Sequence, residues 1–600
     1  MKKITLIITF VAVFLLIQSC NDDFMERIPK TEIGRENFFN TRDDLQMYIN
    51  SLIDWPGQGI YVEASDDGYS TGAVEFRTIM MQPTSSATIN AGWNWGKLRQ
   101  INFFLENYNK ADIPQADLDH FEGVARFHRA RFYMGMLKRF GDVPWYDKVL
   151  EADDPELFKA RDSREYVIDR IFEDYSFAAD HVRPGGQVGE VNKWVVKTFM
   201  ARHALYEGTF RKYHDYLGLQ YESYLRIARD QTRDIIESDY FSIYSTGNPE
   251  SDYSTLFNNT DLAGNPEIIL LNRSVEGEKN SGYWSYIFGN YEHSPSKDLL
   301  QAYLMEDGSY YSNQAGWETK LFVEEFQNRD PRLSQTYAYP GWIIHNTGTY
   351  ALGTPGTPYI QELARNFTGY HQLKGFVNNL SPVYQASIDW PVLRYAEVLL
   401  IYAEARAELQ ELTQADLDMS INELRSRAGM PQMTMNPQVD PIQAARYPGL
   451  SASTPQWAEL LEIRRERRVE LARESRRYND LMRYRAGHLL ETAPEGLYFP
   501  GLGNFDLTGD GYPDIKLIPY TEIVPPFAER EMNEIGQTLI YFRTGPLGTD
   551  AVVYLEHGDH GNIVVASDMG SFEDPKHYYR PIPQRDVQIN QNLVQIFGWD

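Results

Sequence analysis

Oxygen-bearing residues at alternate positions, three of them aspartates, mark the segment of this chain best suited to hold a metal ion. The oxygen ligands at positions 1, 3, 5, 7 and 9 of a calcium loop would come from Asp506, Thr508, Asp510, Tyr512 and Asp514. Position 6 is glycine, as the tight turn of such a loop requires, and position 7 would act through its main-chain carbonyl. Position 12, normally a bidentate glutamate, is Leu517. The segment is therefore either a structural Ca²⁺ loop completed from elsewhere or a simple Asp- and Gly-rich turn.

Three patterns that could indicate catalysis lack the context that catalysis needs. Residues 68–72 match the G-x-S-x-G nucleophile elbow, but the polar residues 63–67 replace the buried strand that must precede it. The sequence His557-Gly-Asp-His560 lacks further histidines to close a zinc site. The chain has 84 acidic residues, and no local pattern selects two of them as a glycosidase pair. The sequence therefore predicts no catalytic residues.

Aromatic side chains outside the helical segments are the best candidates for ligand contacts. Tyr and Trp combine a flat apolar face with a polar edge, which suits stacking on sugars, and loops expose such rings more readily than helices do. The densest group of rings lies in residues 281–291. The alternative for each ring is packing in the core. The predicted ligand-binding residues are Tyr69, Arg77, Trp93, Asn94, Tyr283, Trp284, Tyr286, Tyr291 and Trp342.

Apolar residues at helical spacing supply the framework that must position these side chains. Predicted helices lie at 43–54, 95–108, 116–140, 163–179, 191–210, 221–236, 390–409, 414–427 and 456–485. Paired helices with short turns indicate a mainly α, tetratricopeptide-like scaffold of helical hairpins. We expect one unit over 41–600, with helical scaffold at 41–247 and 388–490. A loop-rich, ligand-binding lobe with short strands, including one near 551–555, would occupy 248–387 and 491–600.

The N-terminus has the layout of an export signal. Two lysines precede an apolar run, residues 4–17, that is too short to span a membrane, and Ser19-Cys20 follows. Residues 17–20 resemble the lipobox of bacterial lipoproteins, in which the cysteine is acylated. We therefore expect a signal peptide at 1–19, lipidation of Cys20 and a tether at 20–40. The alternative is an ordinary signal peptide with an incidental cysteine.

The net charge of −27 opposes binding to nucleic acid, because both partners would be anionic. It also argues against a strongly anionic polysaccharide as ligand, unless a local basic patch overrules the overall charge.

Six blocks in order resemble the SusD/RagB family of outer-membrane nutrient-binding lipoproteins. Residues 122–144, EGVARFHRARFYMGMLKRFGDVP, are similar to the family's EARFLRA…FGDVP pattern, with a changed start. The others are WGKLRQINFFLE at 95–106, PVLRYAEVLLIYAEA at 391–405, NELRSRAG at 422–429, RRERRVELA running on to RYNDL at 464–481, and YRPIPQ with a Gly-Trp ending at 579–599. Alternating Arg and Glu in these blocks indicate ion pairs that hold helices in register, which is a scaffold role.

The resemblance implies a non-enzymatic lipoprotein facing the cell exterior from the outer membrane. Such a protein would capture oligosaccharide or polysaccharide and deliver it to a SusC-like, TonB-dependent transporter, with no cofactor beyond the calcium considered above. Two alternatives remain: a binder of peptide or another nutrient from the same family, and a surface glycoside hydrolase.

Overall fold

A computed structural model describes residues 38–57, 65–70, 72, 74–81, 85–89, 92–186, 188–275, 278–279, 293–346, 354–379 and 387–599. The predicted lipidation site Cys20, its tether up to residue 37, and Tyr283, Trp284, Tyr286 and Tyr291 lie outside these residues. No helix of the described part is long and apolar enough to cross a membrane.

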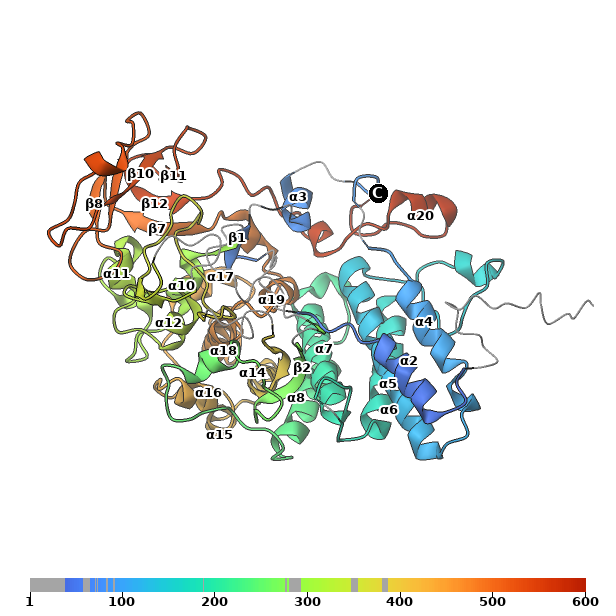
Figure 1. Cartoon of the computed structure of the whole chain (residues 1–600). Coiled ribbons are helices and arrows are strands. Elements are labelled where there is room, and N and C mark those ends of the chain that lie inside the picture. Colours follow the sequence, from blue (N-terminus) through green and yellow to red (C-terminus); the bar gives the residue numbers. More distant parts are fainter. Residues whose placement is uncertain are drawn as a thin grey trace, which may run out of the picture.

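The first half of the chain forms antiparallel helical hairpins, as the periodicity predicts (Figure 1). Ser163 caps α6 (Arg164–His181) by accepting a hydrogen bond from the Tyr166 amide, and Asn192 caps α7 (Lys193–Tyr213) through the amides of Trp194 and Val195. Helix α5 (Gln115–Phe140) is followed by Gly141, which caps its C-terminal end with a positive φ of 70°. These helices are α2 (Arg42–Ser51), α3 (Glu75–Met81), α4 (Gly96–Leu105), α5 (Gln115–Phe140), α6 (Arg164–His181), α7 (Lys193–Tyr213) and α8 (Glu222–Ile236).

The second helical group joins the first through the central helix α14 (Tyr395–Glu408), which contacts α7, α8 and α18. This group comprises α14 (Tyr395–Glu408), α15 (Gln414–Asp418), α16 (Ile421–Arg427), α17 (Pro441–Arg446), α18 (Trp457–Glu470) and α19 (Arg477–Arg483). Three predicted helices in this group were wrong in extent. The predicted helix 414–427 is interrupted at residues 419–420, between α15 and α16. Residues 390–394 form strand β6 (Trp390–Arg394), paired antiparallel with β2 (Ile268–Asn272), because Pro391 disfavours a helix and β2 satisfies the backbone. The predicted helix 456–485 breaks between α18 and α19, where Arg473 and Ser475 have positive φ.

The lobe contains short strands and helices around a core of its own. Its four-stranded sheet has the order β11-β10-β9-β8, and β12 pairs antiparallel with β7. The strands of these two sheets are β7 (Glu495–Phe499), β8 (Gly503–Phe505), β9 (Ile515–Pro519), β10 (Ile540–Gly545), β11 (Val553–Tyr554) and β12 (Gly561–Val564). The lobe's remaining elements are α9 (Asp252–Thr255), β3 (His293–Pro295), α10 (Lys297–Ala302), α11 (Phe322–Glu325), α12 (Arg332–Thr336), β4 (Ile343–Ile344) and β5 (Thr357–Pro358).

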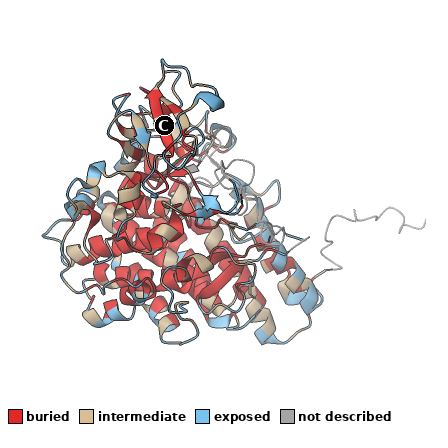
Figure 2. Cartoon of the chain, turned by 60° about the vertical axis from the view of Figure 1, so that its left-hand side comes forward, coloured by how far each residue is buried: buried red, intermediate tan, exposed pale blue. Residues whose placement is uncertain are grey.

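The C-terminal segment leaves the lobe and returns to the helical body. The predicted lobe includes all of 491–600, but Phe572, Tyr578, Tyr579 and Trp599 belong to the helical core. Helix α20 (Gln584–Ile589) lies beside the N-terminal helices, far along the molecule from the sheet (Figure 1). Buried residues fill the inner faces of the helices and of the strands (Figure 2).

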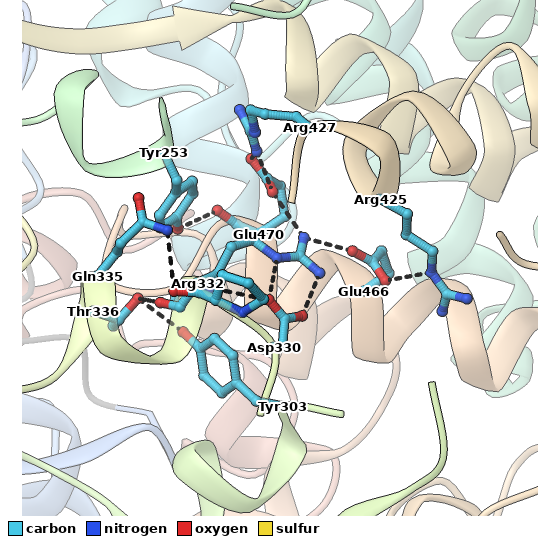
Figure 3. Close-up of polar contacts among 12 residues, drawn as sticks. Tyr253, Tyr303, Asp330, Arg332, Gln335, Thr336, Arg425, Arg427, Glu466 and Glu470 are labelled. Atoms are coloured by element: carbon cyan, nitrogen blue, oxygen red, sulfur yellow. Dashed lines mark hydrogen bonds and ion pairs between the residues drawn. The ribbon is translucent and has the colours of Figure 1, made fainter. Parts of the chain in front are cut away.

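Buried ion pairs join the helical body to the lobe, which confirms the scaffold role predicted for the alternating Arg and Glu residues. Arg332 of α12 donates to Glu466 and Glu470 of α18 at 2.6 and 3.0 Å and also pairs with Asp330 (Figure 3). Arg427 of α16 binds both carboxylate oxygens of Glu470 at 2.6 Å. Burial raises the pKa of such a carboxyl group, but the surrounding guanidinium groups outweigh it and lower the pKa of Glu466 to about 2.

Candidate functional site

The arginines of α18 and α19 fix the short strand that carries Tyr69. Asp66 accepts hydrogen bonds from Arg477 Nε and Nη2, both at 2.7 Å, and Asp67 accepts one from Arg468 Nε at 2.7 Å. Burial would raise the pKa of Asp66, but Arg477, Arg468 and Arg446 hold it well below its usual value. Strand β1 (Gly68–Ser70), which follows directly, is therefore anchored to the scaffold by charge-assisted hydrogen bonds.

The structure brings the predicted residues Tyr69 and Arg77 together. The Arg77 guanidinium lies 4.3 Å from the centre of the Tyr69 ring. Tyr69 also lines a cavity of about 200 Å³ with Phe367, Tyr554 and aliphatic side chains. In the β1–β3 ladder Tyr69 is paired with Ser294, in the strand that follows the predicted aromatic segment in the sequence.

Trp93 lines a larger cavity, of about 350 Å³, between α4, the segment that follows α5, and α20. Its ring is half-buried and packs edge-to-face on Phe140 and Trp95, at centroid distances of 4.8 and 5.1 Å. Trp95 in turn packs edge-to-face on Tyr146 at 5.3 Å. Three rings of the cavity wall thus form one connected aromatic surface.

Polar groups from three separate segments complete the wall of this Trp93 cavity. Arg99 and Asn102 follow Trp95 at helical spacing along α4, Lys148 comes from the segment after α5, and α20 and its end supply Asp586 and Asn590. Asn102 donates through Nδ2 to the carbonyls of Tyr146 and Lys148 at 3.0 and 3.1 Å. Its Oδ1 is buried and receives no hydrogen bond from the described residues. Burial raises the pKa of Asp586.

Neither Asn94 nor Trp342 is among the residues that line these two cavities. Asn94 is exposed, and its Oδ1 accepts a hydrogen bond from the Gly96 amide at 2.8 Å, which organises the start of α4. Trp342 is 9% exposed and packs in a small cluster with Tyr359 and Phe376.

The predicted calcium loop is organised by hydrogen bonds from its own backbone. Asp514 accepts from the amides of Leu507 and Thr508 at 2.7 and 2.8 Å. Asp506 accepts from Gly509 and Gly511, and Asp510 from Tyr512, at 2.6, 2.9 and 2.8 Å. Among the described residues no group of three or more His, Cys, Asp or Glu side chains is arranged to hold a metal ion. Calcium binding here stays a prediction.

Sequence reasoning found Trp93 but missed the residues around it. The spacing of Trp95, Arg99 and Asn102 could have indicated one helix face, since i, i+4 and i+7 align on a helix. Asp586 and Asn590 carry no comparable pattern, because they reach the cavity only through the return of the C-terminal segment to the helical body.

The fold is that of a helical-hairpin protein with an inserted loop-rich lobe. A sequence model described as the SusD family matches residues 266–599, more than half of the chain, and the chain belongs to that family. This confirms the resemblance drawn from the six sequence blocks.

Individual relatives agree with this assignment. SusD-like protein P2 of Formosa agariphila is 23% identical over 554 residues, covering 86% of this chain and 98% of the relative. SusD-like protein P38 of the same organism is 23% identical over 516 residues, covering 80% and 92%. Among solved structures, a SusD-like protein of Bacteroides fragilis NCTC 9343 superposes with a TM-score of 0.65 at 20% identity, covering 94% of this chain and 98% of its own. A second structure from that strain, described as a SusD-like carbohydrate binding protein, superposes with a TM-score of 0.65 at 21% identity. The match covers 93% of this chain and 100% of that one. These structures confirm the predicted fold class.

Proposed function

We propose that this protein is a lipid-anchored surface protein that binds oligosaccharide without cleaving it and passes it to a SusC-like, TonB-dependent transporter in the outer membrane. Membership of the SusD family supports this proposal, as does the carbohydrate-binding description of a Bacteroides fragilis protein with the same fold. Lipidation at Cys20 would supply the anchor. One acyl chain holds a protein only marginally, whereas the two or three chains of a lipoprotein hold it stably.

The Trp93 cavity is the observation that carries the glycan-binding part of the proposal. Its volume of about 350 Å³ is at the small end of the range for ligand pockets, which suits a short stretch of a glycan rather than a large compact ligand. Trp93 and Tyr146 offer faces or edges for sugar rings, and the side chains of Lys148 and Asp586 add polar groups to the wall. The wall is thus mainly apolar, with three aromatic rings and a few polar groups, which suits recognition of a neutral sugar.

Replacing Trp93 by alanine tests this assignment. We expect W93A to weaken oligosaccharide binding by about tenfold or more, because a stacking face is lost, while the far-ultraviolet circular dichroism spectrum stays unchanged. Trp317, also half-buried but outside the cavity, supplies the matched control, and W317A should bind as the wild type does. Equal affinities of W93A and wild type for every oligosaccharide bound would remove the cavity from the proposal.

A further inference from the structure

A second cavity, of about 380 Å³, lies where α3, α5, α7, α19 and the C-terminal segment meet. Its wall includes the side chains of Lys138 and Arg139 from α5, Arg580 from the C-terminal segment and Glu75 from α3. Three cations therefore face one carboxylate, in a protein whose net charge is −27. This is a local positive site within an acidic molecule.

Among the described residues, Lys138 is the cation of this cavity wall for which no carboxylate partner is found. Glu75 is taken by its neighbours, since Arg139 Nη2 contacts Glu75 Oε1 and Arg580 Nε lies 3.5 Å from Oε2. No hydrogen bond or ion pair from the described residues reaches the Lys138 ammonium, which instead lies 4.1 Å from the centre of the Tyr206 ring. Most buried cations of this protein are paired, so an open ammonium at a cavity wall is an exception.

The surroundings of Lys138 favour an incoming anion. Behind the cavity, Arg202 and Arg476 share the carboxylate of Glu397, and Arg483 pairs with Glu404 and Asp480. Burial, followed by the charges of Arg202, Arg476 and Arg483, lowers the pKa of Lys138 to about 7. A carboxylate placed beside the ammonium would offset both effects through a charge-assisted hydrogen bond.

The remaining wall of the cavity is suited to a sugar ring that bears the carboxylate. The aromatic side chains Phe76, Tyr206, Tyr478 and Tyr578 line it, and Asn479 adds an amide that can both donate and accept. Gly135 lies one helical turn before Lys138 and Arg139, on the same face of α5, and a Cβ added there would meet no atom within 4 Å. The glycine thus leaves room for a ligand above the two cations.

We propose that this cavity binds a hexuronic acid unit, with its carboxylate on Lys138 and its ring among the aromatic side chains. This proposal rests on the glycan-binding function proposed above and adds to it the recognition of an acidic glycan. It is separate from the Trp93 cavity: the two cavities have no wall residue in common.

Isothermal titration calorimetry of the full chain with galacturonate and glucuronate, and with galactose and glucose as neutral counterparts, tests the proposal. We expect the acids to bind at least about tenfold more tightly than the neutral sugars, and K138M to remove that preference. G135L, which fills the space without changing charge, should also weaken binding, whereas K320M in the lobe should not. A purely structural Lys138 would make K138M less stable to urea; we expect stability equal to or above wild type, because a desolvated ammonium is removed.

The proposal would be overturned by no binding of either acid, by equal binding of acids and neutral sugars, or by unchanged binding in both K138M and G135L. Acetate that binds as tightly as the hexuronates would also overturn it, since the site would then recognise only the carboxylate. If hexuronates do not bind the wild type and K138M still binds oligosaccharide, the proposed glycan-binding function stands and this uronate site is rejected. Hexuronate binding lost in K138M, without binding of any oligosaccharide, would support the site and reject the general function.

Discussion

Replacement of Arg394 by methionine should reveal how strongly the buried ion pairs hold the scaffold. The Arg394 guanidinium donates to Glu474 through Nε and Nη2 at 2.8 and 2.7 Å, and through Nη1 to Glu267 and Glu470, both at 2.7 Å. Nη2 also donates to the Glu470 carbonyl at 2.8 Å, and the side chain is 2% exposed. Removing one partner from such a buried network costs about 3–5 kcal/mol, because carboxylates are left without their counterion.

The remaining cations place R394M near the lower end of this range. In R394M, the guanidinium of Arg427 would still pair with both Glu470 and Glu267. The ammonium of Lys374 would still pair with Glu474, at 2.6 Å. We therefore expect a loss of about 3 kcal/mol in the free energy of unfolding, measured by urea titration followed by circular dichroism. R394K should also destabilise, since an ammonium cannot reproduce the two-pronged contact with Glu474.

An exposed ion pair supplies the matched control for this measurement. Arg226 and Glu222 pair at 3.1 Å on the surface of α8, with side chains 51% and 53% exposed. R226M should change the free energy of unfolding by no more than about 0.5 kcal/mol, because water and salt screen the pair. Equal urea midpoints for R394M and R226M would refute the reasoning that the buried pairs hold the scaffold together.

Two further predictions concern acid and calcium. Glu466 has its pKa lowered to about 2 in the folded protein against the ordinary 4.5, so its stabilising contribution is complete above pH 4.5 and is lost as the pH falls toward 2. The urea concentration at the unfolding midpoint of the wild type should therefore decrease as the pH is lowered from 5 to 3, and it should decrease less in E466Q. The same decrease with pH in both proteins would contradict this. If residues 506–514 bind calcium, added Ca²⁺ should raise the melting temperature of the wild type, EDTA should reverse the rise, and D510N should not respond. A wild type that melts at the same temperature in Ca²⁺ and in EDTA would show that the segment is a simple turn.

The helices were largely predictable because local pattern and tertiary burial agree along them. The predicted helix 116–140 differs from α5 only at its start, and Ser163 and Asn192 act as caps at the start of two others. The errors arose where tertiary contacts decide the structure. Strand β6 exists because β2 lies beside it, and the break between α18 and α19 places Arg477 on Asp66.

The candidate sites were only partly predictable, since each collects residues from distant parts of the chain. Trp93 and the Tyr69–Arg77 pair could be selected as aromatic or polar residues outside the helical blocks. Trp342 met the same criterion but lies in a packed cluster, because exposure cannot be read from residue type. Lys138 lies within a scaffold block, and its lack of a counterion is visible only once the neighbouring helices are placed.

Binding of oligosaccharides by the full-length protein is the measurement that most directly tests the proposed function. Calorimetric titration with a panel of neutral and acidic oligosaccharides, followed by chromatography of the recovered sugars, separates binding from cleavage. We predict saturable binding of at least one glycan class, recovered uncleaved, with affinity reduced in W93A or, for uronate-containing glycans, in K138M. Shortened sugars, or binding of peptides with no binding of any glycan, would contradict a glycan-capturing role.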